Sequence, residues 1–159
     1  MAWKRIVLRV MCFAFLGVLM EVFFTGLGPA ITRGDWDLEG DCSLWMLPIY
    51  GLLGIFVAPV SGRLQQWRIP LFLRAALYMA FIFLVEYLFG ALFDWAGLEI
   101  WNYSKRALNL HGYITLTYAP FWYFLGLWLE FLNRKFDACA TAWAYGHSAD
   151  TLISHRQDL

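Results

Sequence analysis

Four long apolar segments alternate with short polar stretches along the chain. They span residues 6–27, 44–60, 71–93 and 113–132. Each has about the 17–25 residues that a helix needs to cross the hydrocarbon core of a bilayer. Pro48 and Pro59 interrupt the second segment. We expect a kink there, because neighbouring helices can satisfy the carbonyls that proline frees. The pattern predicts an all-α polytopic integral membrane protein, a bundle of four transmembrane helices.

The composition agrees with a membrane protein. The 159 residues are 61% hydrophobic and 19% aromatic, which excludes an ordinary soluble domain. We therefore expect a membrane domain over residues 1–136 and a polar cytoplasmic tail over residues 137–159. The first apolar segment carries Glu21 and is too long for the apolar core of a signal peptide, so we interpret it as an uncleaved span.

Lysine and arginine predict the orientation, because they accumulate in the cytoplasmic loops of membrane proteins. Seven of them lie before or within the first turn of the first segment, between the second and third, or after the fourth, whereas three lie in the opposite loops. The seven are Lys4, Arg5, Arg9, Arg63, Arg68, Arg134 and Lys135, and the three are Arg33, Lys105 and Arg106. Both termini are therefore predicted to be cytoplasmic, in a plasma membrane or a bacterial inner membrane.

Two carboxylates lie inside the apolar segments, where a charge costs roughly 2.5–3.5 kcal/mol. Glu21 and Glu86 each lie about 22 Å along an outward-running helix at 1.5 Å per residue. We therefore expect them at a similar depth, in the outer half of the membrane. They are the candidates for proton transfer, although a buried glutamate can also simply hold two helices together.

Other polar and aromatic residues share this predicted level and are candidates for a binding site. They are Ser43, Trp45, Tyr50, Trp101, Asn102, Tyr103, Ser104 and His111. By contrast, Arg74 and Glu130 lie near the cytoplasmic ends of their segments, where long side chains reach the interface, and we interpret them as structural.

Several classes of site are not indicated. Cys12, Cys42, Cys139, His147 and His155 have no metal-ligand spacing, so no metal or cofactor is predicted. A formal net charge of zero gives no reason to expect nucleic acid. The chain contains no glycine-rich phosphate loop, so it is not itself predicted to be an ATPase.

Short motifs along the chain resemble a known family. They are the Glu21 motif EVFFT, SLWMLPIYG from Ser43, Glu86, WNYS from Trp101 and GYITL from Gly112. In order and spacing they resemble the transmembrane protein 229 family, which is grouped with bacterial CmpB-like proteins described as ABC-transporter type IV. The resemblance covers most of residues 10–132 and implies four spans without an established activity. The family often has Asp where this chain has Asn102, which favours a positioning role there and leaves Glu21 and Glu86 as the titratable candidates.

Three functions remain open. The protein could bind or process a lipid or another amphipathic molecule at the polar site. It could be a permease-like subunit, self-associating or joined to a separate energy-coupling partner. It could also be a structural membrane protein. Whether it catalyses a reaction stays open.

Overall fold

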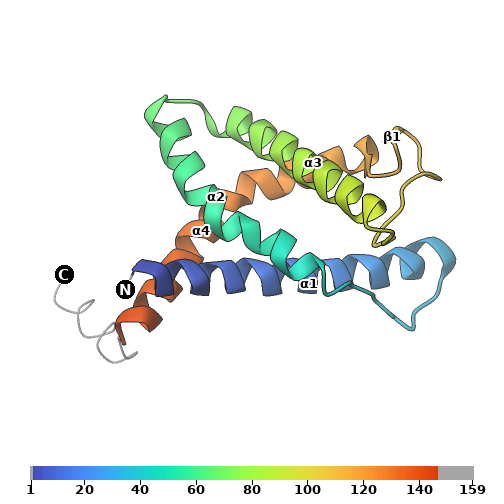
Figure 1. The fold of residues 1–159 in the computed structure, drawn as a ribbon, viewed down its shortest axis with the longest axis horizontal. Coiled ribbons are helices and arrows are strands. Elements are labelled where there is room, and N and C mark those ends of the chain that lie inside the picture. The colour runs from blue at the N-terminus through green and yellow to red at the C-terminus, as the bar shows by residue number, and fades with distance from the viewer. Residues whose placement is uncertain (1, 147–159) are drawn as a thin grey trace. The chain divides into compact units, whose positions relative to one another are not determined.

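The computed structural model describes residues 2–146 and is mostly helical, with 74% helix and 3% strand. Figure 1 shows the long helices, which are α1 (Ala2–Arg33), α2 (Met46–Gln66), α3 (Leu71–Trp95) and α4 (Ala119–Tyr145). The chain forms two compact units. Unit 1 comprises Met1–Val57 and Phe131–Leu159, and unit 2 comprises Ala58–Glu130. Helices α2 and α4 therefore each contribute residues to both units.

Three of the described helices are long and apolar enough to cross a membrane. They are Trp3–Arg33, Met46–Gln66 and Leu71–Trp95. Large apolar side chains on these helices point outward: Phe15 is 61% exposed and Leu88 is 57% exposed. Outward apolar faces on this scale are typical of a protein surrounded by lipid rather than by water. The helical, membrane-type fold is thus confirmed, and α2 runs through both Pro48 and Pro59.

The fourth predicted span differs from the helix observed. Tyr113 lies in a turn, residues 114–118 form a strand and a short 3₁₀ helix, and α4 begins only at Ala119. At its other end α4 continues to Tyr145, well past residue 132. Glu130, Arg134, Lys135 and Asp137 interrupt the apolar pattern of α4, and it is not among the three helices above. The apolar pattern predicted neither end of α4 correctly. Residues 113–118 are apolar but precede the helix, and residues 133–145 are helical but include charged side chains. His147 and His155 lie outside the described residues.

Small residues allow close helix packing within each unit. In unit 1, a Cβ atom on Gly54 of α2 would lie 2.6 Å from the Val10 Cα of α1. In unit 2, a Cβ atom on Gly126 of α4 would lie 2.7 Å from the Ala75 carbonyl oxygen of α3. Neither position has room for a side chain, so these glycines bring the backbones of two helices together, as small residues do in membrane proteins.

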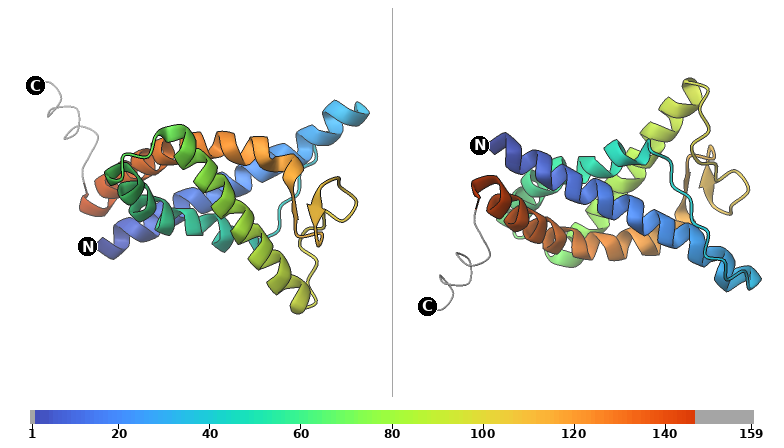
Figure 2. Two further views of the ribbon diagram at one scale, coloured as in Figure 1. Left: turned by 90° about the horizontal axis from the view of Figure 1, so that it is seen from above. Right: turned by 90° about the horizontal axis from the view of Figure 1, so that it is seen from below.

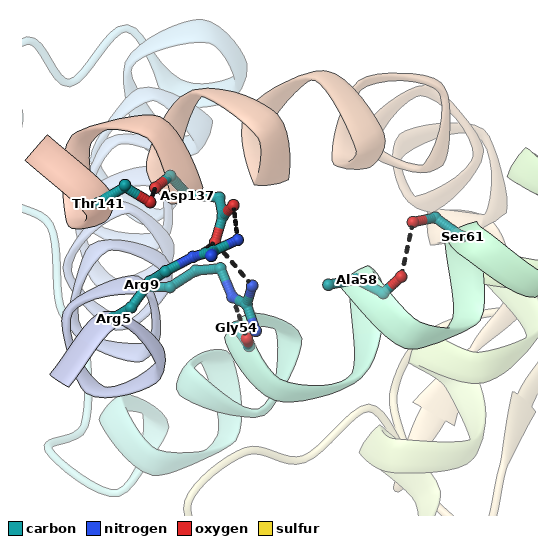
Figure 3. Close-up of polar contacts among 7 residues, drawn as sticks. All are labelled: Arg5, Arg9, Gly54, Ala58, Ser61, Asp137 and Thr141. Atoms are coloured by element: carbon teal, nitrogen blue, oxygen red, sulfur yellow. Dashed lines mark hydrogen bonds and ion pairs between the residues drawn. The ribbon is translucent and has the colours of Figure 1, made fainter. Parts of the chain in front are cut away.

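A buried ion pair joins the two chain segments that make up unit 1. Arg9 is 7% exposed, and its Nη1 donates to Asp137 Oδ1 at 3.0 Å while its Nε donates to the Gly54 carbonyl oxygen at 2.5 Å. Arg5 also pairs with Asp137. Figure 3 shows both guanidinium groups directed at the one carboxylate, from α1 towards α4. We call Arg5, Arg9, Gly54 and Asp137 the Arg9–Asp137 cluster. It holds α1, α2 and α4 together with charge-assisted hydrogen bonds.

A second buried ion pair lies in unit 2. Glu130 is only 6% exposed, and Arg74 approaches both of its oxygens, with Nε at 2.7 Å and Nη2 at 3.0 Å. Tyr78 and Gln65 each donate a further hydrogen bond, at 2.9 Å. We call these four residues the Arg74–Glu130 cluster. The predicted snorkelling of Glu130 to the interface is therefore wrong, because its carboxylate is buried among four donated hydrogen bonds.

A small hairpin follows α3. Strands β1 (Asn109–Leu110) and β2 (Ile114–Thr115) are antiparallel, with Asn109 opposite Thr115 and Leu110 opposite Ile114. Figures 1 and 2 show the chain leaving the end of α3, forming this hairpin and turning into α4. The 3₁₀ helix η1 (Leu116–Tyr118) makes the turn, and the Thr115 side chain caps it by accepting from the Thr117 N–H.

Candidate functional site

The end of α3 sets the position of the candidate site. The chain reverses at Gly97, whose φ of +74° is in the left-handed region that favours glycine. The Leu98 N–H then donates back to the Phe93 carbonyl oxygen at 2.8 Å, as at many helix C-termini. Residues 98–113 are therefore directed back beside the last turn of α3.

Two asparagine side chains hold the following loop in shape. Asn102 Oδ1 accepts from the Ser104 N–H at 2.8 Å, which is a common way for asparagine to close a turn. Asn109 Oδ1 accepts from the Gly112 N–H at 3.2 Å, and its amide donates to the Arg106 carbonyl oxygen at 2.8 Å. The loop thus needs no long strands, because side chains satisfy its backbone groups.

Further contacts fasten the loop to α3. The Trp101 indole N–H donates to the Tyr113 carbonyl oxygen at 2.9 Å, and the Trp101 ring meets Phe93 edge to face at 5.7 Å. The Tyr87 hydroxyl lies 2.8 Å from His111 Nδ1. A Cβ atom on Gly90 would lie 2.8 Å from the Tyr113 Cβ, so this glycine admits the tyrosine against the helix.

These contacts form an open pocket of about 320 Å³, which we call the hairpin pocket. Its size falls in the range of small-molecule sites, about 300–1,000 Å³. Its lining combines carboxylates, neutral hydrogen-bonding groups and aromatic rings. The lining residues are Gly90, Phe93, Asp94, Gly97, Leu98, Glu99, Ile100, Trp101, Asn102, Ser104, His111, Gly112 and Tyr113.

The polar groups of the hairpin pocket are ordered by one another. The Tyr113 hydroxyl donates to Asp94 Oδ2 at 2.6 Å, and the Asn102 amide donates to Glu99 Oε1 at 2.9 Å. The hydrogen bond to Asp94 raises the pKa of the Tyr113 phenol above its ordinary value of about 10. The phenol is therefore a hydrogen-bond donor throughout the physiological pH range.

Four of the predicted binding residues line this one pocket: Trp101, Asn102, Ser104 and His111. Tyr103 does not line it. Its N–H donates to the Gly112 carbonyl oxygen at 2.8 Å, and its ring packs against Tyr118 at 5.5 Å. Tyr103 therefore contributes to the shape of the loop.

Glu21 lies at a separate polar site in unit 1. It accepts a hydrogen bond of 2.6 Å from the Tyr50 hydroxyl and one of 3.1 Å from the Cys42 thiol. The loop that carries Cys42 reaches α1 because Gly40 passes directly over Val22, where a Cβ atom would lie 2.0 Å from the carbonyl oxygen. Desolvation is the main cause that raises the pKa of the Cys42 thiol to about 12, and the Glu21 hydrogen bond and charge add to it.

The other two predicted residues of unit 1 organise the start of α2. The Ser43 hydroxyl accepts from the Trp45 N–H at 3.3 Å, and the Ser43 carbonyl oxygen accepts from the Met46 N–H at 2.9 Å. The two bonds satisfy backbone donors at and just before the first helical turn, as caps do. Trp45 itself is 52% exposed.

Glu86 lies on α3 in unit 2, where Glu86 Oε2 accepts from the Trp122 indole N–H at 3.2 Å. Glu21 and Glu86 thus belong to different units, and their common depth stays a prediction. Glu86 precedes Asp94 by eight residues, about 12 Å along the helix, and it does not line the hairpin pocket.

Sequence reasoning missed the two carboxylates of the pocket. Asp94 and Glu99 look like ordinary exposed acids at the end of an apolar segment. The available signal was Gly97 between them, because a glycine there allows the chain to turn back and bring both acids to one cavity. Tyr87 was missed as well, since its link to His111 depends on the loop geometry.

No solved structure matches the chain. Over residues 8–149 the sequence matches the family described as "Putative ABC-transporter type IV". This confirms that part of the resemblance based on the motifs, whereas the likeness to transmembrane protein 229 stays a prediction. The match extends from the first helix beyond the end of α4 and covers far more than half of the chain. The protein therefore belongs to the putative ABC-transporter type IV family.

Proposed function

We propose that the protein is a four-span membrane protein, with both termini in the cytoplasm, that binds a small amphipathic molecule in the hairpin pocket. The observation that carries the proposal is the pocket itself. A volume of about 320 Å³, converging hydrogen-bonding groups and aromatic walls lie together at the end of an apolar helix. This position lets one part of a ligand meet polar groups while another part stays in lipid.

The proposed fourth span is α4. Its charges would oppose insertion if they were alone, but the two carboxylates on its buried side are paired with arginines. Glu130 pairs with Arg74 in unit 2, and Asp137 pairs with Arg5 and Arg9 in unit 1. Paired, hydrogen-bonded charges are the form in which ionisable groups occur within membrane bundles.

The count of lysine and arginine residues gives the proposed orientation. With both termini in the cytoplasm, α3 runs outward and the hairpin pocket lies at the outer face of the membrane. We propose a plasma membrane or a bacterial inner membrane, with membrane lipid as the constant neighbour of the outward apolar side chains.

The proposal moves the binding site away from the two buried glutamates. Glu21 is engaged by Tyr50 and Cys42, and Glu86 by Trp122. We propose that these contacts position the helices, and that the hairpin pocket is the surface that meets the ligand.

Native mass spectrometry of the protein purified from its own membranes tests the proposal. We expect a copurified small molecule on the wild type and its loss in Ser104→Leu, because leucine fills the pocket. Lys105→Leu is the matched control, since the neighbouring Lys105 does not line the pocket. An equal adduct on both variants, or none on the wild type, contradicts the proposal.

A second candidate function is that of a permease-like subunit, which the family description favours. On this alternative the chain works as a homo-oligomer or with a separate subunit that hydrolyses ATP. Cross-linking in native membranes followed by purification tests it. A partner with a nucleotide-binding domain, or an oligomer in lipid nanodiscs, supports the alternative, whereas a monomer without partners counts against it.

A structural role is the third alternative. It predicts that the Ser104→Leu variant is folded and fully functional in cells that require the protein.

A further inference from the structure

We infer that the hairpin pocket binds the ammonium group of an organic amine, such as a choline-like or ethanolamine-like head group. This inference rests on the proposed function and adds the charge and chemical class of the ligand. It follows from three properties of the pocket: its charge, its aromatic walls and the state of its hydrogen-bond donors.

The charge of the lining is negative. Asp94 and Glu99 line the hairpin pocket, and no lysine or arginine is among the described residues that line it. Within residues 2–146 neither carboxylate has a lysine or arginine at ion-pair distance, in contrast to Glu130. A cation entering the pocket would therefore meet two carboxylates that no arginine neutralises.

The two carboxylates have acceptor capacity to spare. Asp94 receives a hydrogen bond from Tyr113, and Glu99 receives one from Asn102. An ionised carboxylate has about four lone-pair sites on its two oxygens, so each can accept further hydrogen bonds from a ligand. The neutral donors orient the carboxylates without cancelling their charge.

The two cations of the loop, Lys105 and Arg106, are not among the residues that line the pocket. The Arg106 guanidinium lies over the Tyr118 ring, 5.1 Å from its centre. Neither side chain therefore forms an ion pair with the carboxylates that line the pocket.

Aromatic rings supply the second property. Phe93, Trp101 and Tyr113 line the hairpin pocket together with the two carboxylates. The face of an aromatic ring attracts a cation within about 6 Å, and such rings are used to bind quaternary ammonium groups. Methyl groups on the nitrogen would pack against these rings, while the charge faces the carboxylates.

The donors argue against an anion such as a phosphate. The Ser104 N–H already binds Asn102 Oδ1, and the Gly112 N–H binds Asn109 Oδ1. The Trp101 indole N–H binds the Tyr113 carbonyl oxygen. An anion that used these three N–H groups would have to break their bonds, and it would approach two carboxylates. An ammonium group leaves the three bonds intact.

Calorimetric titration of the purified full chain with choline tests the inference. We expect choline to bind and the uncharged isostere 3,3-dimethylbutan-1-ol, which has the same shape without the charge, to bind at least about tenfold more weakly. Inorganic phosphate should not bind. These comparisons use the wild type, so they do not depend on the folding of any variant.

Isosteric variants then assign the effect to the pocket. Glu99→Gln and Asp94→Asn should each weaken choline binding about tenfold, because each removes one negative charge. Glu39→Gln and Asp37→Asn, two exposed acids in unit 1, are the matched controls and should leave the affinity unchanged. Circular dichroism and gel filtration establish that the variants are folded.

The source of the head group is tested in lipid nanodiscs. If phosphatidylcholine nanodiscs prevent choline from binding and phosphatidylglycerol nanodiscs do not, the head group comes from a lipid. If choline binds equally in both, the ligand is a free amine.

The outcomes separate this inference from the proposed function. Equal binding of choline and its uncharged isostere, or binding of phosphate instead, overturns the ammonium inference and leaves a ligand pocket. If choline does not bind but native mass spectrometry shows a Ser104-dependent adduct, the ammonium inference is also overturned and the ligand pocket remains. Absence of both overturns the proposed function as well.

Discussion

The Arg74–Glu130 cluster and the hairpin pocket both lie in unit 2, yet they surround their carboxylates in opposite ways. Glu130 is 6% exposed and accepts four hydrogen bonds, two of them from an arginine. Asp94 and Glu99 are exposed, and each accepts from one neutral side chain. Glu130 is thus held by charged and neutral donors inside the fold, whereas neutral donors alone orient Asp94 and Glu99 among the described residues.

The largest expected effect follows from breaking the Arg74–Glu130 pair. Arg74→Met alone should destabilise the protein by about 3–5 kcal/mol, because it leaves a buried carboxylate without its partner. Replacing both residues, with Arg74→Met and Glu130→Leu, should recover most of this loss. Thermal unfolding in mild detergent measures both values.

Glu99→Gln, a substitution in the hairpin pocket, is the control for the Arg74–Glu130 cluster. It should change the free energy of unfolding by less than about 0.5 kcal/mol, as most surface substitutions do. If it destabilises the protein as much as Arg74→Met does, the distinction between the two carboxylate environments is wrong.

The second prediction concerns the close approach that lets Arg74 reach Glu130. Gly126→Ala should cost about 1–3 kcal/mol, because the new methyl group would lie 2.7 Å from the Ala75 carbonyl oxygen and push α3 and α4 apart. Gly62→Ala on α2 is the control. It meets nothing within 4 Å and should stabilise its helix by up to about 1 kcal/mol. If Gly126→Ala and Gly62→Ala shift the unfolding temperature in the same direction, the packing argument is contradicted.

The third prediction tests the hairpin pocket in the same way. Gly112→Ala should cost about 1 kcal/mol, because φ is +75° and the added Cβ would lie 3.2 Å from Asn102 Oδ1. Gly97→Ala has a similar φ of +74° but open space around it, so it carries the backbone strain alone. We expect faster amide hydrogen exchange in residues 102–113 for Gly112→Ala than for Gly97→Ala. Identical exchange in the two variants would show that the close approach of the added methyl group to Asn102 does not disturb the loop.

The last prediction concerns the Glu21 site of unit 1, and it is measured as the reactivity of a thiol. With its pKa at about 12, the Cys42 thiol should be ionised to only about one part in ten thousand at pH 8. Its alkylation by iodoacetamide should therefore keep rising up to about pH 12, whereas an ordinary thiol levels off above about pH 8.5.

Glu21→Gln should make Cys42 more reactive, because it removes a hydrogen bond and a negative charge that both raise the pKa of the thiol. Desolvation remains and should keep that pKa above the ordinary value. Replacing Cys12 and Cys139 by serine in both proteins ensures that the alkylation measured is that of Cys42. A plateau near pH 9 in the protein that retains Glu21 would contradict the raised pKa of the thiol. Equal reactivity of the two proteins would contradict the thiol–carboxylate contact.

The sequence predicted the helices better than their ends. The apolar segment at 71–93 became α3 almost unchanged, because the same side chains that favour lipid also form a continuous helix. The prediction of a transmembrane helix was wrong for residues 113–118. Tyr113, Ile114 and Tyr118 are apolar enough for a span, but they lie in the hairpin and in the turn after it. Apolar character alone does not reveal where a backbone leaves the helix.

The ion pairs and the pocket were harder to predict for a different reason. Asp137 appeared to belong to a polar tail, and its partner Arg9 lies 128 residues earlier in the sequence. Trp101, Asn102, Ser104 and His111 were predicted at one level and line one pocket, whereas the acids Asp94 and Glu99 beside them were not predicted. The two acids reach the pocket because the chain turns at Gly97 between them. The hydropathy pattern does not predict that turn.

The walls of the hairpin pocket all come from one uninterrupted segment, residues 90–113. Such a pocket is modular: the segment could be exchanged between relatives as a single piece. Its ligand preference could then diverge while the helices that insert into the bilayer stay the same.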